Sequence, residues 1–131
     1  MESLLDETMR MLYKTIESFS KNEKLKTMKI YLGSDHAGYK MKEMLEVFIH
    51  DLGHEVIDKG VIHPEAQDDY PDYIAPVARE VSKKSDTCKG IILGGSGQGE
   101  AMVANRFKQV RTAVFYGGDE EIISLSREHN N

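Results

Sequence analysis

A glutamate at the end of a glycine-rich turn is the clearest candidate in this sequence for a residue that does chemistry. Glu100 follows residues 94–99, in which positions 94, 95, 97 and 99 are glycine. Glycines let a backbone approach a ligand closely, and N–H groups at the start of a following helix point toward negative charge. A carboxylate beside such donors suits proton transfer next to a carbonyl, because the N–H groups stabilise the enediolate oxygen while the base moves the proton. A helix start lowers the pKa of Glu100 and burial under a substrate raises it, so both directions stay open.

Two further polar residues are expected to face this turn. Asp35 and His36 follow the apolar segment 29–33, and the glycine turn follows the apolar segment 89–93. If both segments are parallel strands, their carboxyl ends meet where the strand order reverses, and ligands bind at that point in open α/β sheets. We therefore expect Asp35 and His36 to lie across a cleft from Glu100.

The amino-acid sequence of the turn does not match three well-known loop motifs. A dinucleotide-binding G-x-G-x-x-G would need glycine where Glu100 stands, and a Walker A loop would need Lys and Ser or Thr where Glu100 and Ala101 stand. A carboxylate at that position would repel nucleotide phosphates. The G-x-S-x-G elbow of the α/β-hydrolases would need glycine in place of Gln98. The turn therefore supports neither nucleotide binding nor serine-hydrolase chemistry.

Composition and charge narrow the class of protein. The 131 residues are 40% hydrophobic and 30% charged, as in a soluble globular domain, and the net charge is -5. An acidic chain without a basic run is not expected to bind nucleic acid, and no stretch predicts a membrane span or a secretory signal. Cys88 is the single cysteine, so an internal disulfide is excluded and a reducing, cytoplasmic setting is expected. No CxxC or HExxH motif predicts a metal site.

Strand-like and helix-like segments alternate from residue 28 onward. The predicted strands are 29–33, 55–58, 89–93 and 111–115. The predicted helices are 39–52, 71–84, 100–107 and 119–128. This alternation indicates an α/β fold: a three-layer, Rossmann-like parallel sheet in flavodoxin-like order, with helices on both faces. In the order 2-1-3-4 the switch point lies between the first and third strands.

Residues 1–27 differ from the domain predicted at 28–131. Apolar residues at helical spacing predict an amphipathic helix over 4–19, and the polar residues 18–27 predict a linker. The simpler interpretation is an appended segment. The alternative is a helix that docks on a neighbouring element or on a partner subunit.

Four motifs, in the same order, resemble ribose-5-phosphate isomerase B, a sugar-phosphate isomerase family that also includes the galactose-6-phosphate isomerase subunits. The motifs are YLGSDHAGY at 31–39, DYPDY at 69–73, GGSGQGE at 94–100 with Ala104 and Asn105, and REHNN at 127–131. The resemblance runs from Met28 to Asn131. It implies aldose–ketose isomerisation between ribose 5-phosphate and ribulose 5-phosphate through an enediolate, without a metal or organic cofactor.

The resemblance also implies roles for the site residues. Many members carry a cysteine base at the first position of the glycine turn, which here is Gly94, and this sequence is similar to the branch with a glutamate at the position of Glu100. The implied catalytic residues are Glu100 as the base, Ser96 as the group that polarises the substrate and His129 as the ring-opening acid or base. The implied substrate contacts are Asp35 to the sugar hydroxyls, His36 to the phosphate, Tyr70 lining the pocket, Gly95, Gly97 and Gly99 in the anion hole, and Asn130 beside His129.

Alternatives stand beside these roles. Asp35 also suits a helix cap, and Glu100 and His129 also suit charges that complement helix dipoles. The glycine turn favours function for Asp35 and Glu100, whereas for His129 the structural interpretation stays equally open. Five- and six-carbon sugar phosphates both fit the motifs.

The resemblance implies more chain after residue 131. Family members continue with a further strand, a C-terminal helix and arginines that grip the phosphate, some of them from the partner subunit. The sequence ends at Asn131, so we expect a C-terminally truncated member, with a homodimer or higher oligomer where the C-terminal part is present. The alternative is a catalytically weak sugar-phosphate-binding or subunit-type homologue, similar to galactose-6-phosphate isomerase, that lacks the arginines.

Overall fold

The computed structural model describes residues 10, 11, 14, 27–60, 69–119 and 121–130. The chain divides into two compact units, one formed by Thr27–Val114 and the other by Met1–Lys26 together with Phe115–Asn131. The second unit contains the helix α5 (Glu121–Asn130), which lies two residues later than the helix predicted at 119–128. Residues 10, 11 and 14 are helical, and the rest of the helix predicted over 4–19 lies outside the described residues.

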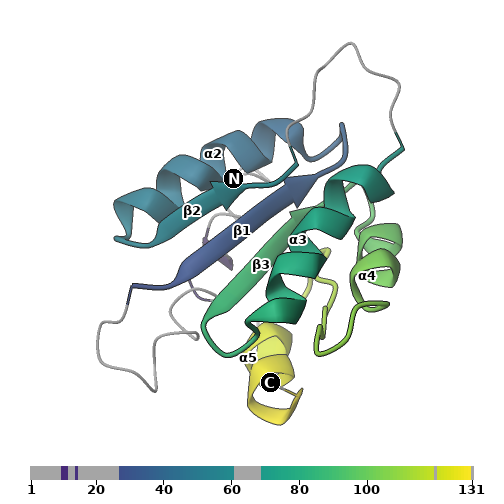
Figure 1. Cartoon of the computed structure of the whole chain (residues 1–131). Coiled ribbons are helices and arrows are strands. Elements are labelled where there is room, and N and C mark those ends of the chain that lie inside the picture. Colours follow the sequence, from purple (N-terminus) through teal and green to yellow (C-terminus); the bar gives the residue numbers. More distant parts are fainter. Residues whose placement is uncertain (1–9, 12–13, 15–26, 61–68, 120, 131) are drawn as a thin grey trace. The chain divides into compact units, whose positions relative to one another are not determined.

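A parallel sheet forms the centre of the larger unit. Its strands are β1 (Lys29–Ser34), β2 (Glu55–Asp58) and β3 (Cys88–Leu93), in the order β2-β1-β3 (Figure 1). Lys29 at the start of β1 pairs in register with Glu55 of β2 and Cys88 of β3. The predicted α/β class and the predicted order of these three strands are confirmed. The switch point therefore lies between the carboxyl ends of β1 and β3.

Helices cover both faces of the sheet. They are α2 (Tyr39–Asp51), α3 (Pro71–Lys83) and the short α4 (Gln98–Ala104), and α2 and α3 lie on opposite faces (Figure 1). Tyr31 packs with Val77 of α3, whereas its buried neighbours Ile30 and Leu32 point the other way, because successive strand residues alternate between faces. The strand β1 is thus buried from both sides.

A glycine in β1 lets α3 lie close to the sheet. A Cβ at Gly33 would lie 2.6 Å from the Tyr73 carbonyl oxygen and 2.7 Å from Val77 Cγ2, which is far inside contact distance. The close packing fixes the start of α3 beside the carboxyl end of β1. That end of β1 leads directly into the turn that carries Asp35 and His36.

The prediction of a strand at 111–115 is wrong. These residues form no strand, and none of them is buried. The Thr112 N–H donates to Asn105 Oδ1 at 2.7 Å, and the Thr112 carbonyl accepts from Asn105 Nδ2 at 3.0 Å. Both backbone groups of Thr112 are therefore taken by a side chain rather than by a neighbouring strand. The helix predicted at 100–107 also has different bounds in the structure. The observed helix α4 begins two residues earlier and ends three residues earlier than predicted.

Within the described residues, no helix is both long enough and apolar enough to cross a membrane.

Candidate active site

The turn between β1 and α2 is tied to the turn after β3. The Asp35 N–H donates to the Leu93 carbonyl at 3.1 Å, at the carboxyl end of β3. Asp35 Oδ1 accepts the Gly38 N–H at 2.9 Å, and Asp35 Oδ2 accepts the Gly95 N–H at 3.3 Å. The carboxylate of Asp35 thus links its own turn to the glycine turn, and the two segments predicted to face each other are in contact.

The glycine turn leads into α4 through a left-handed residue. Gly97 is the N-cap of α4 and has a φ of 77°, a backbone conformation that residues other than glycine rarely adopt. The Ser96 hydroxyl accepts the Gln98 N–H at 3.2 Å, which holds the turn locally, while the Ser96 side chain stays exposed. The turn is therefore a fixed backbone shape with an exposed hydroxyl at its tip.

Glu100 is buried beneath this turn. Its side chain is 5% exposed, in the first turn of α4. Burial raises the pKa of Glu100, and the neighbouring Asp35 carboxylate raises it further, both as an acceptor that favours the protonated form of Glu100 and as a negative charge. A hydrogen bond from the backbone of Glu100 itself acts in the opposite direction. Of the two opposing influences on Glu100, the helix start and burial, burial therefore prevails, and the carboxyl group holds its proton more strongly than usual.

Gly94 makes room for the Glu100 carboxyl. A Cβ at position 94 would lie 2.5 Å from Glu100 Oε2, and it would lie even closer to Oε1 and Cδ. Any side chain at 94 would therefore displace the carboxyl of Glu100 from its present position. This overlap gives a physical reason why a chain with glutamate at 100 has glycine, and not cysteine, at 94.

The overlap predicts a stability effect that depends on Glu100. Gly94→Ala is expected to destabilise the fold by about 1–3 kcal/mol, because the added methyl must displace a buried carboxyl. In a Glu100→Ala background the same Gly94→Ala change is expected to be nearly neutral, because the colliding atoms are absent. Chemical denaturation of the four proteins of this cycle measures the difference. An equal loss in both backgrounds would contradict the overlap.

Tyr70 and His36 lie around the same turns. A Cβ at Gly99 would lie 2.7 Å from Tyr70 Oη, so the Tyr70 phenol packs directly against the glycine turn. His36 is exposed, and its ring meets that of Tyr73 edge-on with centroids 6.3 Å apart. The side chains predicted to line the pocket therefore come from two turns and from the start of α3.

His129 and Asn130 occupy the last turn of α5. Both are exposed, and α5 belongs to the second unit of the chain. Their predicted approach to the substrate stays a prediction.

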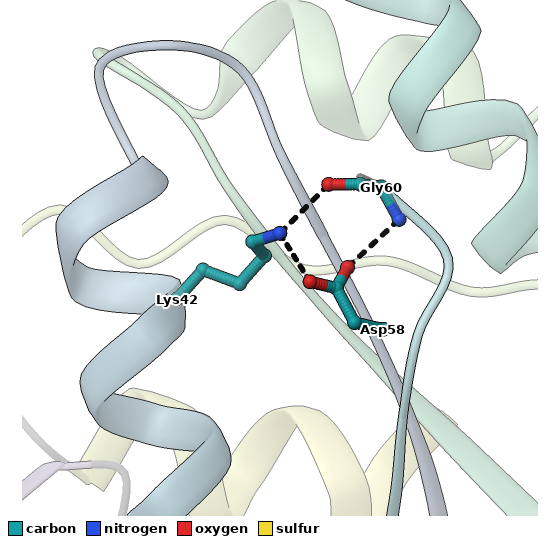
Figure 2. A network of polar contacts seen from close by, with 3 residues as sticks. All are labelled: Lys42, Asp58 and Gly60. Carbon is teal, nitrogen blue, oxygen red and sulfur yellow. Dashed lines mark hydrogen bonds and ion pairs between the residues drawn. The ribbon is translucent and has the colours of Figure 1, made fainter. Parts of the chain in front are cut away.

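A buried lysine beside these turns was missed by the sequence reasoning. Lys42 of α2 is 1% exposed, and its Nζ donates to Asp58 Oδ2 and, at 2.7 Å, to the Gly60 carbonyl (Figure 2). Asp58 Oδ1 in turn accepts the Gly60 N–H at 2.9 Å. The sequence offers one weak signal for it, the helical spacing of Lys42 with Leu45 and Ile49, and in the structure all three residues are buried. The network fixes the residues that follow β2.

Among the described residues, one set of carboxylates lies close enough together to hold a metal ion: Glu43, Glu46 and Asp58. Asp58 is already paired with Lys42, and the set belongs to α2 and β2 rather than to the glycine turn. It has no place in the chemistry of Glu100.

The strand order β2-β1-β3 defines an open parallel α/β protein. Its strand order reverses between β1 and β3, where such proteins bind ligands, and the buried Glu100 carboxyl belongs to the turn that follows β3. The chain belongs to the Ribose/Galactose Isomerase family, which matches residues 30–131.

Individual relatives agree with this assignment. The chain is 42% identical over 105 residues to ribose-5-phosphate isomerase B of Mycobacterium tuberculosis, covering 79% of this chain and 62% of that protein. A crystal structure of ribose-5-phosphate isomerase B from Mycoplasma genitalium with bound ribulose 5-phosphate is similar with a TM-score of 0.72 and 35% identity, over 79% of this chain and 66% of that one. A structure of ribose-5-phosphate isomerase B from Clostridium thermocellum is similar with a TM-score of 0.67 and 39% identity, over 79% of this chain and 67% of that one. The chain thus spans less than two thirds of the length of the Mycobacterium tuberculosis relative.

Proposed function

We propose that this chain carries the catalytic base of an aldose–ketose isomerase that interconverts ribose 5-phosphate and ribulose 5-phosphate. The observation that carries the proposal is the Glu100 carboxyl, buried at the start of α4 in the space left by Gly94. The names of the relatives support the same reaction, and one of the similar structures contains ribulose 5-phosphate.

In the proposed mechanism Glu100 removes the proton from C2 of the open-chain aldose and returns it to C1. The electron pair of the broken C–H bond forms the enediolate, whose oxygen is stabilised by Ser96 and by the N–H groups of the glycine turn. The proton of the C2 hydroxyl passes to the oxygen on C1, so that a carbonyl forms at C2 and a hydroxyl at C1 as Glu100 returns its proton to C1. A raised pKa of Glu100 supports this role, because a base that must also return its proton works best when its pKa approaches the working pH. Gly95 already donates to Asp35, so we assign the oxyanion to Gly97 and Gly99.

Proton NMR in D₂O tests this proposal on the full chain. Incubation with ribose 5-phosphate is expected to produce ribulose 5-phosphate, with deuterium at C1 of the ketose where the base exchanges its proton with solvent. A parallel incubation with allose 6-phosphate measures the preference between five- and six-carbon substrates. Ligand-induced thermal stabilisation without any ketose would contradict the isomerase and favour a sugar-phosphate-binding homologue.

A further inference from the structure

Asn105 follows the glycine turn in the third of the four sequence motifs, and the proposed mechanism gives it no role. It is the C-cap of α4, where its N–H donates to the Ala101 carbonyl at 2.9 Å. Its side chain accepts the Thr112 N–H at 2.7 Å and donates to the Thr112 carbonyl at 3.0 Å. One amide side chain thus closes the loop of residues 105–112 and holds the chain that leaves this loop.

The chain after Thr112 reaches the other end of α4. A Cβ at Gly97, the N-cap of α4, would lie 3.2 Å from Val114 Cγ1, so a methyl group of Val114 packs against Gly97 in its left-handed conformation. Val114 is half-buried and lies two residues after Thr112. The chain therefore returns from the end of α4 to its beginning, where it lies against the glycine turn.

The hold of Asn105 on Thr112 limits where Val114 can lie. Two extended residues span about 7 Å at most, so a fixed Thr112 leaves Val114 little freedom to move away from Gly97. Thr112 belongs to no strand that could hold its backbone in place of the Asn105 amide. Loss of that amide would therefore release Val114 and remove one wall of the turn at Gly97.

We propose that Asn105 is a positioning residue that acts on the reaction through Thr112 and Val114, by holding Val114 against Gly97. The inference rests on the proposed function, in which the Gly97 N–H stabilises the enediolate oxygen. Such a donor acts on charge that develops in the transition state, so a displaced Gly97 lowers kcat and changes KM little. A merely structural loop clamp would lower the melting temperature and leave the kcat of the folded protein unchanged.

The Gly97 amide can be observed alone, because Gly97 is the one glycine of the sequence that follows a serine. Cell-free synthesis with ¹³C-carbonyl serine and ¹⁵N-glycine therefore gives one carbonyl-coupled amide signal in NMR. In Asn105→Ala we expect this signal to shift. Ser82→Ala is the matched control and should leave the signal in place, because Ser82 Oγ donates to the Lys108 carbonyl at 2.6 Å in the same loop without holding Thr112. An unmoved Gly97 signal in Asn105→Ala would overturn the proposal.

Kinetics supply the second arm. In Asn105→Ala we expect kcat for ribose 5-phosphate to fall about 10-fold, with KM little changed and with Ser82→Ala near the wild type. Val114→Ala shortens the side chain that meets Gly97 and is expected to lower kcat as well. In the Val114→Ala background, Asn105→Ala should lower kcat much less than in the wild type, because both changes act through one contact. Losses that multiply independently, or an unchanged kcat in Asn105→Ala, would contradict the proposed route.

Two further outcomes are separable. A wild-type chain without turnover would contradict the proposed function, while the Gly97 signal, which is measured without substrate, would still decide the role of Asn105. If Asn105→Ala does not fold, Asn105→Asp takes its place, because aspartate keeps an acceptor for the Thr112 N–H and loses only the donor to the Thr112 carbonyl. A Gly97 signal that stays in place in both Asn105→Asp and Val114→Ala would overturn the proposal.

Discussion

Glu100→Gln is expected to lower kcat for ribose 5-phosphate isomerisation by about 10²–10⁴-fold and to change KM little. Glutamine has nearly the same shape as glutamate, so it fills the space beside Gly94, but it cannot take up the substrate proton and return it. Steady-state measurement of ketose formation gives both constants. Glu43→Gln, at an exposed position of α2, is the control for loss of one carboxylate and should leave kcat unchanged. Turnover of Glu100→Gln near the wild-type rate would remove Glu100 as the base.

The same variant is not expected to lose stability at neutral pH. Burial and Asp35 raise the pKa of Glu100 in the folded chain, so folding favours the protonated carboxyl. The contribution of Glu100 to stability is therefore greatest below its unfolded pKa and is lost as the pH rises through the raised folded pKa. Glutamine stays neutral throughout, so Glu100→Gln should match or exceed the wild-type Tm at neutral pH. A low Tm together with low activity would point to damaged folding rather than to a missing base.

The central elements were predictable because each has a strong local pattern. Short apolar segments marked β1 and β3, and the reversal of strand order between them implied that Asp35 would meet the glycine turn. The segment 111–115 is as apolar as a strand, yet Asn105 takes the two backbone groups of Thr112 that a sheet would need. That competition comes from a side chain seven residues away, which a pattern of hydrophobicity does not register.

Other features of the site depend on distances that no residue pattern contains. Position 94 is glycine in a run of glycines, and only the location of the Glu100 carboxyl shows that a side chain at this position would have to displace that carboxyl. The direction of the Glu100 pKa likewise required the burial of its side chain and the approach of Asp35. Lys42 was passed over because lysine is rarely buried without a partner, and its partners Asp58 and Gly60 lie 16 and 18 residues further along the chain.

Lys42→Met is expected to destabilise the protein by about 3–5 kcal/mol, because it removes the cation from a buried ion pair. Asp58 is only 18% exposed, so its carboxylate would keep the Gly60 N–H but lose the ammonium group that compensates its burial. The Gly60 carbonyl would lose its donor as well. Methionine fills a similar volume, so the loss measures the interaction rather than a cavity.

A surface ion pair of the same sheet provides the matched control for Lys42. Lys29 lies 3.8 Å from Glu55, with the two side chains 37% and 57% exposed, so Lys29→Met should cost less than about 1 kcal/mol. Lys42→Met combined with Asp58→Asn should be less destabilising than the two separate losses added together, because asparagine keeps an acceptor for Gly60 without an uncompensated charge. Denaturant unfolding of all four variants separates these values. Equal small losses for Lys42→Met and Lys29→Met would show that the buried network contributes no more than a surface pair. A large loss for Lys42→Met alone would instead identify Lys42 as the residue that secures the chain after β2 against the carboxyl end of β1, since a Cβ at Gly60 would lie 3.2 Å from the Ser34 nitrogen, one residue before Asp35.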